Sequence, residues 1–282
     1  MWTQTHAGHR YALILGSTRF EVDAELGGRI TEFSVNGQNA LMGLSDLGDW
    51  TNGGSTFWTS PQAAWGWPPN ATLDRERYTA SLQGDVLTLE SQPFTVGKSA
   101  LTVSKRFRPD PACEAVDIEY TVTNHGAPLV LAAWEISRVP ATGITFFAGN
   151  RLRALNQLPK PLTSGDAGMV WLDHAAQEVE AKLGADATLG FTAHATPALL
   201  FVKTFATVGS GRVAAGEAEI EFYVKPHAYV EIEQQSASRE LGKGEQLSYA
   251  LKWFVRAMPS DLDSTVMNDR LARFALKVGG LS

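Results

Sequence analysis

Period-two alternation of apolar and polar residues runs through most of the chain and predicts β-strands, because successive side chains of a strand point to opposite faces. Two turns, Asn36-Gly37 and Gly84-Asp85, lie between such segments and predict hairpins, since these residues tolerate positive φ. The expected strands cover residues 11–15, 19–24, 28–35, 38–42, 77–83, 86–90, 100–107, 115–124, 128–137, 169–172, 189–194, 198–205, 219–224, 229–235 and 246–256.

The pattern changes at the end of the chain, where a helix is expected. Ser260 and Asp263 have the spacing of a capping box, and apolar residues from Leu262 to Val278 then fall near helical spacing. Residues 146–166 and 206–216 are rich in glycine, proline or other turn residues and predict loops. With no linker or repeat in view, we predict one all-β domain spanning residues 1–282, with a short C-terminal helix.

Composition narrows the class of protein. The net charge of −6 gives no basic surface for nucleic acid, and no apolar run is long enough to cross a membrane. The first ten residues lack the apolar segment of a signal peptide, so a cytoplasmic location is expected. Cys113 is the single cysteine, no histidines have metal-ligand spacing, and no phosphate-binding glycine motif occurs. We expect no cofactor and no metal, and the oligomeric state stays open.

The stretch 52–69 is the most distinctive part of the sequence, because half of the 8 tryptophans fall within residues 50–67. Its glycines and prolines predict a long ordered loop on the surface. Flat indole faces suit the C–H faces of sugar rings, and amides can bind hydroxyls. In the alternative interpretation, the loop folds back and caps one end of the sandwich, with its tryptophans buried. The candidate saccharide-binding residues here are Asn52, Trp58, Gln62, Trp65 and Trp67.

Glutamates alternate with apolar residues in two successive predicted strands, at Glu219 and Glu221 and again at Glu231 and Glu233. Side chains two apart share a face, so neighbouring strands would crowd these carboxylates and raise their pKa values. Such crowding suits acid–base chemistry, with Glu233 on the side open to a ligand. The alternative is a solvated outer face of an antiparallel sheet.

Four other charged residues and one histidine are candidates for the same site. Glu135 interrupts an apolar strand, and Arg138, three residues on, is placed to pair with it. Lys203 is an isolated cation in an apolar strand, which either meets an acidic ligand or extends to the surface. Arg29 follows two glycines and either binds a ligand or pairs with an acid, and His227 is the one histidine near Glu233.

Three segments, taken in order, resemble aldose 1-epimerases (galactose mutarotases). Residues 26–41 resemble their opening hairpin, and 52–62 lies where they carry a His-Gly-Gly-type motif. Ile-Glu-Gln-Gln at 232–235, followed by Leu-Gly-Lys-Gly-Glu at 241–245, resembles their Leu-Glu-x-Gln segment and later Pro-Gly-Glu turn. The resemblance extends from residue 27 to 253 and implies a galactose mutarotase-like supersandwich of antiparallel sheets.

The resemblance also implies roles for particular residues. Glu233 matches the family's catalytic base, whereas the first family histidine corresponds to Asn52 and the second to Trp134 or Glu135. Glu135 is therefore the second catalytic candidate, in the place of the family's acid. Three hypotheses follow: a sugar 1-epimerase with Glu233 as base, a non-catalytic carbohydrate-binding module, and a structural or interaction module of the same fold.

Overall fold

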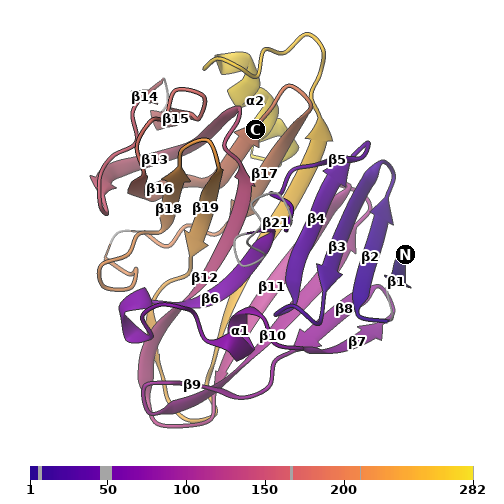
Figure 1. The fold of residues 1–282 in the computed structure, drawn as a ribbon, viewed down its shortest axis with the longest axis vertical. Helices are drawn as coiled ribbons and strands as arrows, with labels where there is room; N and C mark the ends of the chain where they lie inside the picture. Colours follow the sequence, from indigo (N-terminus) through magenta and orange to yellow (C-terminus); the bar gives the residue numbers. More distant parts are fainter. Residues whose placement is uncertain (6–7, 45–52, 166–167, 210, 282) are drawn as a thin grey trace.

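The computed structural model describes residues 1–5, 8–44, 53–165, 168–209 and 211–281, which form a two-layered antiparallel β-sandwich (Figure 1). Every strand pairing is antiparallel. The first layer contains, in spatial order, β1 (Trp2–Thr5), β2 (Arg10–Leu15), β3 (Thr18–Asp23), β4 (Arg29–Val35), β6 (Ser55–Ser60), β12 (Leu129–Pro140), β19 (Tyr229–Gln235) and β18 (Ile220–Lys225). The second contains β7 (Thr79–Gln83), β8 (Val86–Glu90), β10 (Ser99–Asp110), β11 (Ala115–Asn124), β21 (Gln246–Ala257) and β17 (Leu199–Phe205).

Two long strands join the layers. β16 (Ala181–Ala195) pairs with β18 through its first half and with β17 through its second, and β13 (Ile144–Ala154) runs beside it. The remaining elements are short: β5 (Gln38–Asn39), β9 (Phe94–Val96), β14 (Leu162–Ser164), β15 (Met169–Asp173), β20 (Arg239–Leu241), the 3₁₀ turn η2 (Gln62–Ala64) and the helices α1 (Ala71–Asp74) and α2 (Asp269–Val278). Within the described ranges, no helix has the length and apolar character needed to cross a membrane.

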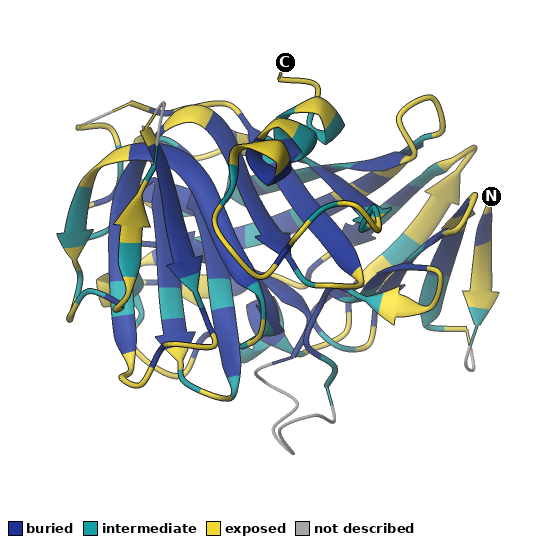
Figure 2. Ribbon diagram, turned by 90° about the horizontal axis from the view of Figure 1, so that it is seen from above, coloured by how far each residue is buried: buried dark blue, intermediate teal, exposed yellow. Residues whose placement is uncertain are grey.

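Aromatic side chains from both layers fill the space between them. The rings of Phe20 in β3 and Phe107 in β10 lie 5.5 Å apart, and Phe57 in β6 stacks on Tyr120 in β11 at 4.3 Å. Figure 2 shows that most central strands are largely buried, whereas the loops and edge strands such as β1 and β7 carry exposed residues. Strands with one covered face, such as β10 and β11, bury every second residue, which explains the period-two pattern.

Helix α2 covers the outer face of the second layer. Its Leu271 and Ala275 belong to a separate apolar cluster that includes Val202 of β17 and Phe254 of β21. The prediction of a helix start at Ser260 is wrong, because the helix begins at Asp269 with Asn268 as its N-cap, Leu271 N donating to Asn268 Oδ1 at 2.8 Å. Asp263 instead accepts from Thr265 N, which forms a local turn.

Two predicted loops contain regular structure. Residues 146–166 include most of β13, in which Phe146 and Phe147 are buried, and the register shifts near Gly149 and Arg151 explain why the alternation is hard to read. The stretch 52–69 includes β6 and η2. All six residues of β6 are buried because both of its faces are covered, so its sequence lacks the period-two alternation that would predict a strand.

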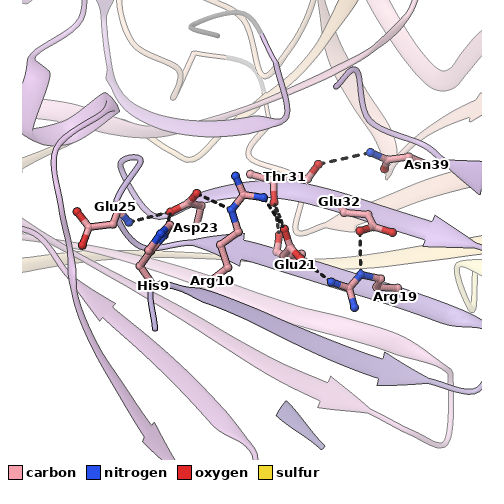
Figure 3. Close-up of polar contacts among 9 residues, drawn as sticks. All are labelled: His9, Arg10, Arg19, Glu21, Asp23, Glu25, Thr31, Glu32 and Asn39. Carbon is pink, nitrogen blue, oxygen red and sulfur yellow. Dashed lines mark hydrogen bonds and ion pairs between the residues drawn. The ribbon is translucent and has the colours of Figure 1, made fainter. Parts of the chain in front are cut away.

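The outer face of β2, β3 and β4 carries a network of ion pairs (Figure 3). Arg10 Nε donates to Asp23 at 2.9 Å, and Arg19 Nε donates to Glu32 at 2.9 Å. Glu21 accepts from Arg19 and lies beside Arg10. These paired charges cover the outside of the sheet, and the Glu21 and Asp23 side chains are themselves only 8% and 6% exposed.

A buried ion pair links the two layers inside the sandwich. Lys203 Nζ of β17 donates to Glu135 Oε2 of β12 at 2.7 Å, and Ser55 Oγ donates to the other carboxylate oxygen at 2.7 Å. Lys203 is fully enclosed, so the expectations that it reaches the surface or an acidic ligand are wrong. The expected pair of Glu135 with Arg138 is also wrong, because residues an odd number apart on a strand face opposite sides.

We predict that Lys203→Met lowers the free energy of unfolding by on the order of 3–5 kcal/mol, because it leaves the Glu135 carboxylate buried and uncompensated. The double variant Lys203→Met/Glu135→Gln removes both charges and should regain most of the loss. Urea unfolding of the wild type and both variants measures the difference. A single variant as stable as the wild type would contradict the prediction.

Candidate functional site

A pocket of about 350 Å³ lies on the outer side of the first layer, over β6, β12, β19, β18 and β16. We call it the tryptophan pocket. Its lining residues are Trp58, Gln62, Trp67, Trp134, Leu155, Asn156, Lys182, Tyr223, Tyr229 and Glu231.

Strand register places the pocket's charged residues in one row. Lys182 of β16 lies opposite Tyr223 of β18, Tyr223 lies opposite Glu231 of β19, and Glu231 lies opposite Arg138 of β12. Residues in register across antiparallel strands share a face of the sheet. The row therefore runs along one wall of the tryptophan pocket.

The tryptophans divide into those that line the pocket and one that supports them. Trp58 meets Trp134 edge to face at 5.6 Å and donates from Nε1 to Asp74 Oδ1 at 2.9 Å. Trp67 leaves 64% of its surface exposed and lies 6.0 Å from Trp58. Trp65 does not line the pocket; its Nε1 donates to Thr59 O at 2.7 Å. The segment 55–67 thus forms one wall of the pocket, with exposed and packed indoles together.

Beneath the pocket, two glutamates converge on one lysine. Lys182 Nζ lies 2.7 Å from Glu221 Oε2 and 3.4 Å from Glu233 Oε2, and Trp134 Nε1 donates to the same Glu233 oxygen at 2.8 Å. Glu221 lies directly opposite Glu233 on the paired strands β18 and β19. The prediction that neighbouring strands crowd these carboxylates is confirmed.

This arrangement shifts the pKa values of all three groups. Burial raises the pKa of Glu233 to about 8; Lys182 opposes the shift, while Glu221 and Glu231 add to it. Burial likewise raises the pKa of Glu221 against the effect of Lys182. Burial alone would lower the pKa of Lys182, but Glu233 and Glu221 outweigh it and hold that pKa above its usual value. Lys182 therefore stays charged, and Glu233 titrates near neutral pH.

Glu233 does not face open solvent, which corrects the expectation drawn from alternation alone. It shares the pocket side of β19 with Glu231, yet it is fully buried, and it does not line the pocket. Trp134 and Lys182, which bind its Oε2, line the pocket in its place. Its Oε1 finds no hydrogen-bond partner in the described part of the chain.

Glu231 is the carboxylate that reaches the pocket. Its side chain is 15% exposed, and Arg138 Nε donates to its Oε1 at 2.8 Å. Arg138 is fully buried; its Nη1 donates to Thr56 Oγ1 at 3.0 Å, and its guanidinium lies 5.4 Å from the Trp58 ring. Arg138 thus supports the pocket from behind.

The other candidates lie elsewhere. Glu135 points into the sandwich, on the face of β12 opposite to the pocket, so it cannot act on a ligand beside Glu233. Arg29 is buried and contacts Asp74 Oδ1 at 3.3 Å and Gly53 O at 2.9 Å, so it pairs with an acid. His227 is exposed in the turn between β18 and β19 and does not line the pocket. Asn52 lies outside the described residues.

Sequence reasoning missed Lys182, Asn156, Tyr223 and Tyr229. Lys182 is the second residue of β16, a strand that we expected only from residue 189, so the place of Lys182 in the sheet was not predicted. Tyr223 and Tyr229 each lie two residues from a glutamate of the alternating pair, and this spacing was the available signal for both.

Two buried histidines form a polar cluster away from the pocket. Thr145 Oγ1 lies 2.6 Å from His174 Nε2 and 3.0 Å from His194 Nδ1. Burial lowers the pKa of His194 to about 3, and burial also lowers the pKa of His174, so both imidazoles are neutral. No cluster of three or more metal-binding side chains occurs among the residues the structure describes.

The fold is that of galactose mutarotase-like proteins. The chain is similar to a provisionally named aldose 1-epimerase from Escherichia coli K12, with 13% identity, a TM-score of 0.61 and coverage of 88% of this chain and 99% of that one. A galactose mutarotase-like protein from Clostridium acetobutylicum has 9% identity and a TM-score of 0.60, covering 92% and 98%. A galactose mutarotase related enzyme from Lactobacillus acidophilus has 7% identity and a TM-score of 0.61, covering 91% and 100%.

No protein-family model and no curated protein sequence matches the chain. At such low identities the structural likeness establishes the fold, and the chemistry has to be argued from the residues of the pocket.

We predict that Glu233→Gln stabilises the protein more at pH 9 than at pH 5. The pKa of Glu233 in the folded protein, about 8, lies above its value in the unfolded chain. Between about pH 4.5 and 8 the folded state therefore binds more protons than the unfolded state, and the free energy of unfolding falls as the pH rises through that window. Glutamine has no such loss. At pH 9, Glu233→Gln should raise the free energy of unfolding by on the order of 1–3 kcal/mol, since one pKa unit corresponds to about 1.4 kcal/mol.

Unfolding in urea at both pH values measures this difference. Glu119→Gln is the matched control, because that glutamate is exposed and pairs with Arg106 on the surface. An equal effect of Glu233→Gln at pH 5 and pH 9 would show that the carboxyl is not perturbed.

Proposed function

We propose that the tryptophan pocket binds a saccharide. The observation that carries the proposal is the combination of three indoles, Trp58, Trp67 and Trp134, with a row of polar groups on one wall. Indole faces pack against the C–H faces of a sugar ring, while polar groups bind its hydroxyls.

The polar groups have the variety that hydroxyls require. Lys182 offers N–H donors and Glu231 offers an acceptor, while the amides of Gln62 and Asn156 supply both. A volume of about 350 Å³ is near the lower end of small-molecule sites, which suits a ligand of one or two sugar units. The fold supports this choice, because structures that share it are named for chemistry on sugars.

We predict that Trp67→Ala weakens saccharide binding by about 1–3 kcal/mol, the order expected when an aromatic anchor is lost. Trp67 is largely exposed, so the substitution should leave the melting temperature nearly unchanged. Calorimetry and tryptophan fluorescence with a panel of monosaccharides and disaccharides measure binding.

Leu189→Ala is the control, since Leu189 is also an exposed apolar residue and does not line the pocket. If the wild type shows no heat and no fluorescence change with any sugar, the saccharide proposal fails and the structural-module hypothesis takes its place.

Epimerisation at the anomeric centre is the second candidate function, with Glu233 as general base. The observation that favours it is the pKa of about 8 on a carboxyl with one unpartnered oxygen. In this reaction a base takes the proton of the anomeric hydroxyl, an acid protonates the ring oxygen, and the opened sugar closes on its other face. Glu233 is fully buried and does not line the pocket, so the Trp134 or Lys182 side chain has to move before an anomeric hydroxyl can reach its unpartnered oxygen.

We predict that, if the wild type accelerates anomer exchange, Glu233→Gln lowers the rate by about 10²–10⁴, the usual cost of losing a general base. Exchange spectroscopy by NMR on α and β anomers measures the rate, with Glu119→Gln as control. A full rate in Glu233→Gln would rule out this base. Binding without acceleration in the wild type would leave the non-catalytic module as the function.

A further inference from the structure

We infer that Glu231 and Lys182 are the charged groups that contact the ligand, and that the ligand is an uncharged sugar whose hydroxyls bridge them. This inference rests on the proposed saccharide function and specifies its substrate class. Glu233 and Glu221 then act as positioning residues for Lys182, and Arg138 does the same for Glu231.

The first argument is position. Glu231 and Lys182 both line the pocket, on either side of Tyr223 in the row across β19, β18 and β16. Glu233 and Glu221 lie two residues further along the same strands, and both are fully buried. A ligand in the pocket therefore contacts Glu231 and Lys182, and it is separated from the buried Glu233 and Glu221.

The second argument is hydrogen-bonding capacity. An ammonium has three donors; Lys182 Nζ donates to Glu233 Oε2 and forms an ion pair with Glu221 Oε2, which leaves at least one donor for a ligand. Arg138 Nε occupies Glu231 Oε1, and the partly exposed carboxylate has a second oxygen that can accept from a hydroxyl. A donor and an acceptor held on one wall fit a pair of neighbouring sugar hydroxyls.

The third argument is charge. The Lys182 ammonium is offset from behind by Glu221, 2.7 Å away, and the Glu231 carboxylate is offset by Arg138. A neutral sugar adds no charge to this arrangement. A carboxylate or phosphate on the ligand would place an uncompensated negative charge beside Glu231, which opposes binding.

The test compares D-glucose and D-galactose with D-glucuronate and D-galacturonate, using calorimetry on the wild type and three variants. Glu231→Gln removes the acceptor charge, and Lys182→Met/Glu221→Gln removes the ammonium while keeping the buried charges balanced. Each should raise Kd for the neutral sugar at least about tenfold. Glu233→Gln keeps an oxygen for Trp134 Nε1 and should raise Kd by less than either, and the uronates should bind at least about tenfold more weakly than their parent sugars.

The outcomes separate this inference from the proposed function. If a neutral sugar binds and Trp67→Ala weakens it while Glu231→Gln and the double variant do not, the saccharide site stands and the inference fails. Tighter binding of a uronate than of its parent sugar overturns the neutral substrate class. If no probe binds the wild type, the saccharide proposal fails and the inference falls with it. Melting temperatures confirm that each variant is folded.

Discussion

The register of β12 between β6 and β19 decides where the charges of this sandwich lie. Glu135 and Ser137 point into the interior from β12, whereas Trp134 and Arg138 point to the pocket side. A slip of one residue would exchange the two sets. It would place the Arg138 guanidinium in the interior and take Glu135 away from Lys203, and a buried charge without a partner is costly. The ion pairs on both faces of β12 therefore favour the same register as the apolar core.

The same register places several acidic groups together beside the pocket. Three glutamates, Glu221, Glu231 and Glu233, surround a single lysine, and the pKa of Glu233 rises to about 8 as a result of its burial and of its neighbours. A core of apolar residues would avoid this cost in stability. This cluster of perturbed carboxyls lies directly beneath the aromatic pocket, and perturbed groups of this kind cluster at functional sites but also in structural ion-pair networks.

Sequence patterns predicted the local features that depend on neighbouring residues, and missed those that depend on distant strands. Hairpins at Asn36-Gly37 and Gly84-Asp85 and the shared face of Glu231 and Glu233 follow from turn chemistry and alternation, and all are present. The burial of Glu233 depends on Trp134, 99 positions away, which no local pattern reveals. β13 was mistaken for a loop because its register shifts break the alternation.

The structure separates two residues that the sequence left as alternatives. The resemblance placed the second family histidine at Trp134 or Glu135, and only Trp134 lies on the pocket side, bound to Glu233. An indole N–H donates a hydrogen bond but has no acceptor nitrogen, so Trp134 cannot exchange protons as an imidazole does. Any acid in this pocket must come from another side chain. Lys182 is the one cationic side chain that lines the described pocket, and it already contacts both buried glutamates. The side chains that could donate a proton to a ligand in the pocket are therefore Lys182, Tyr223, Tyr229 and Glu231, and all four lie outside the motifs of the resemblance.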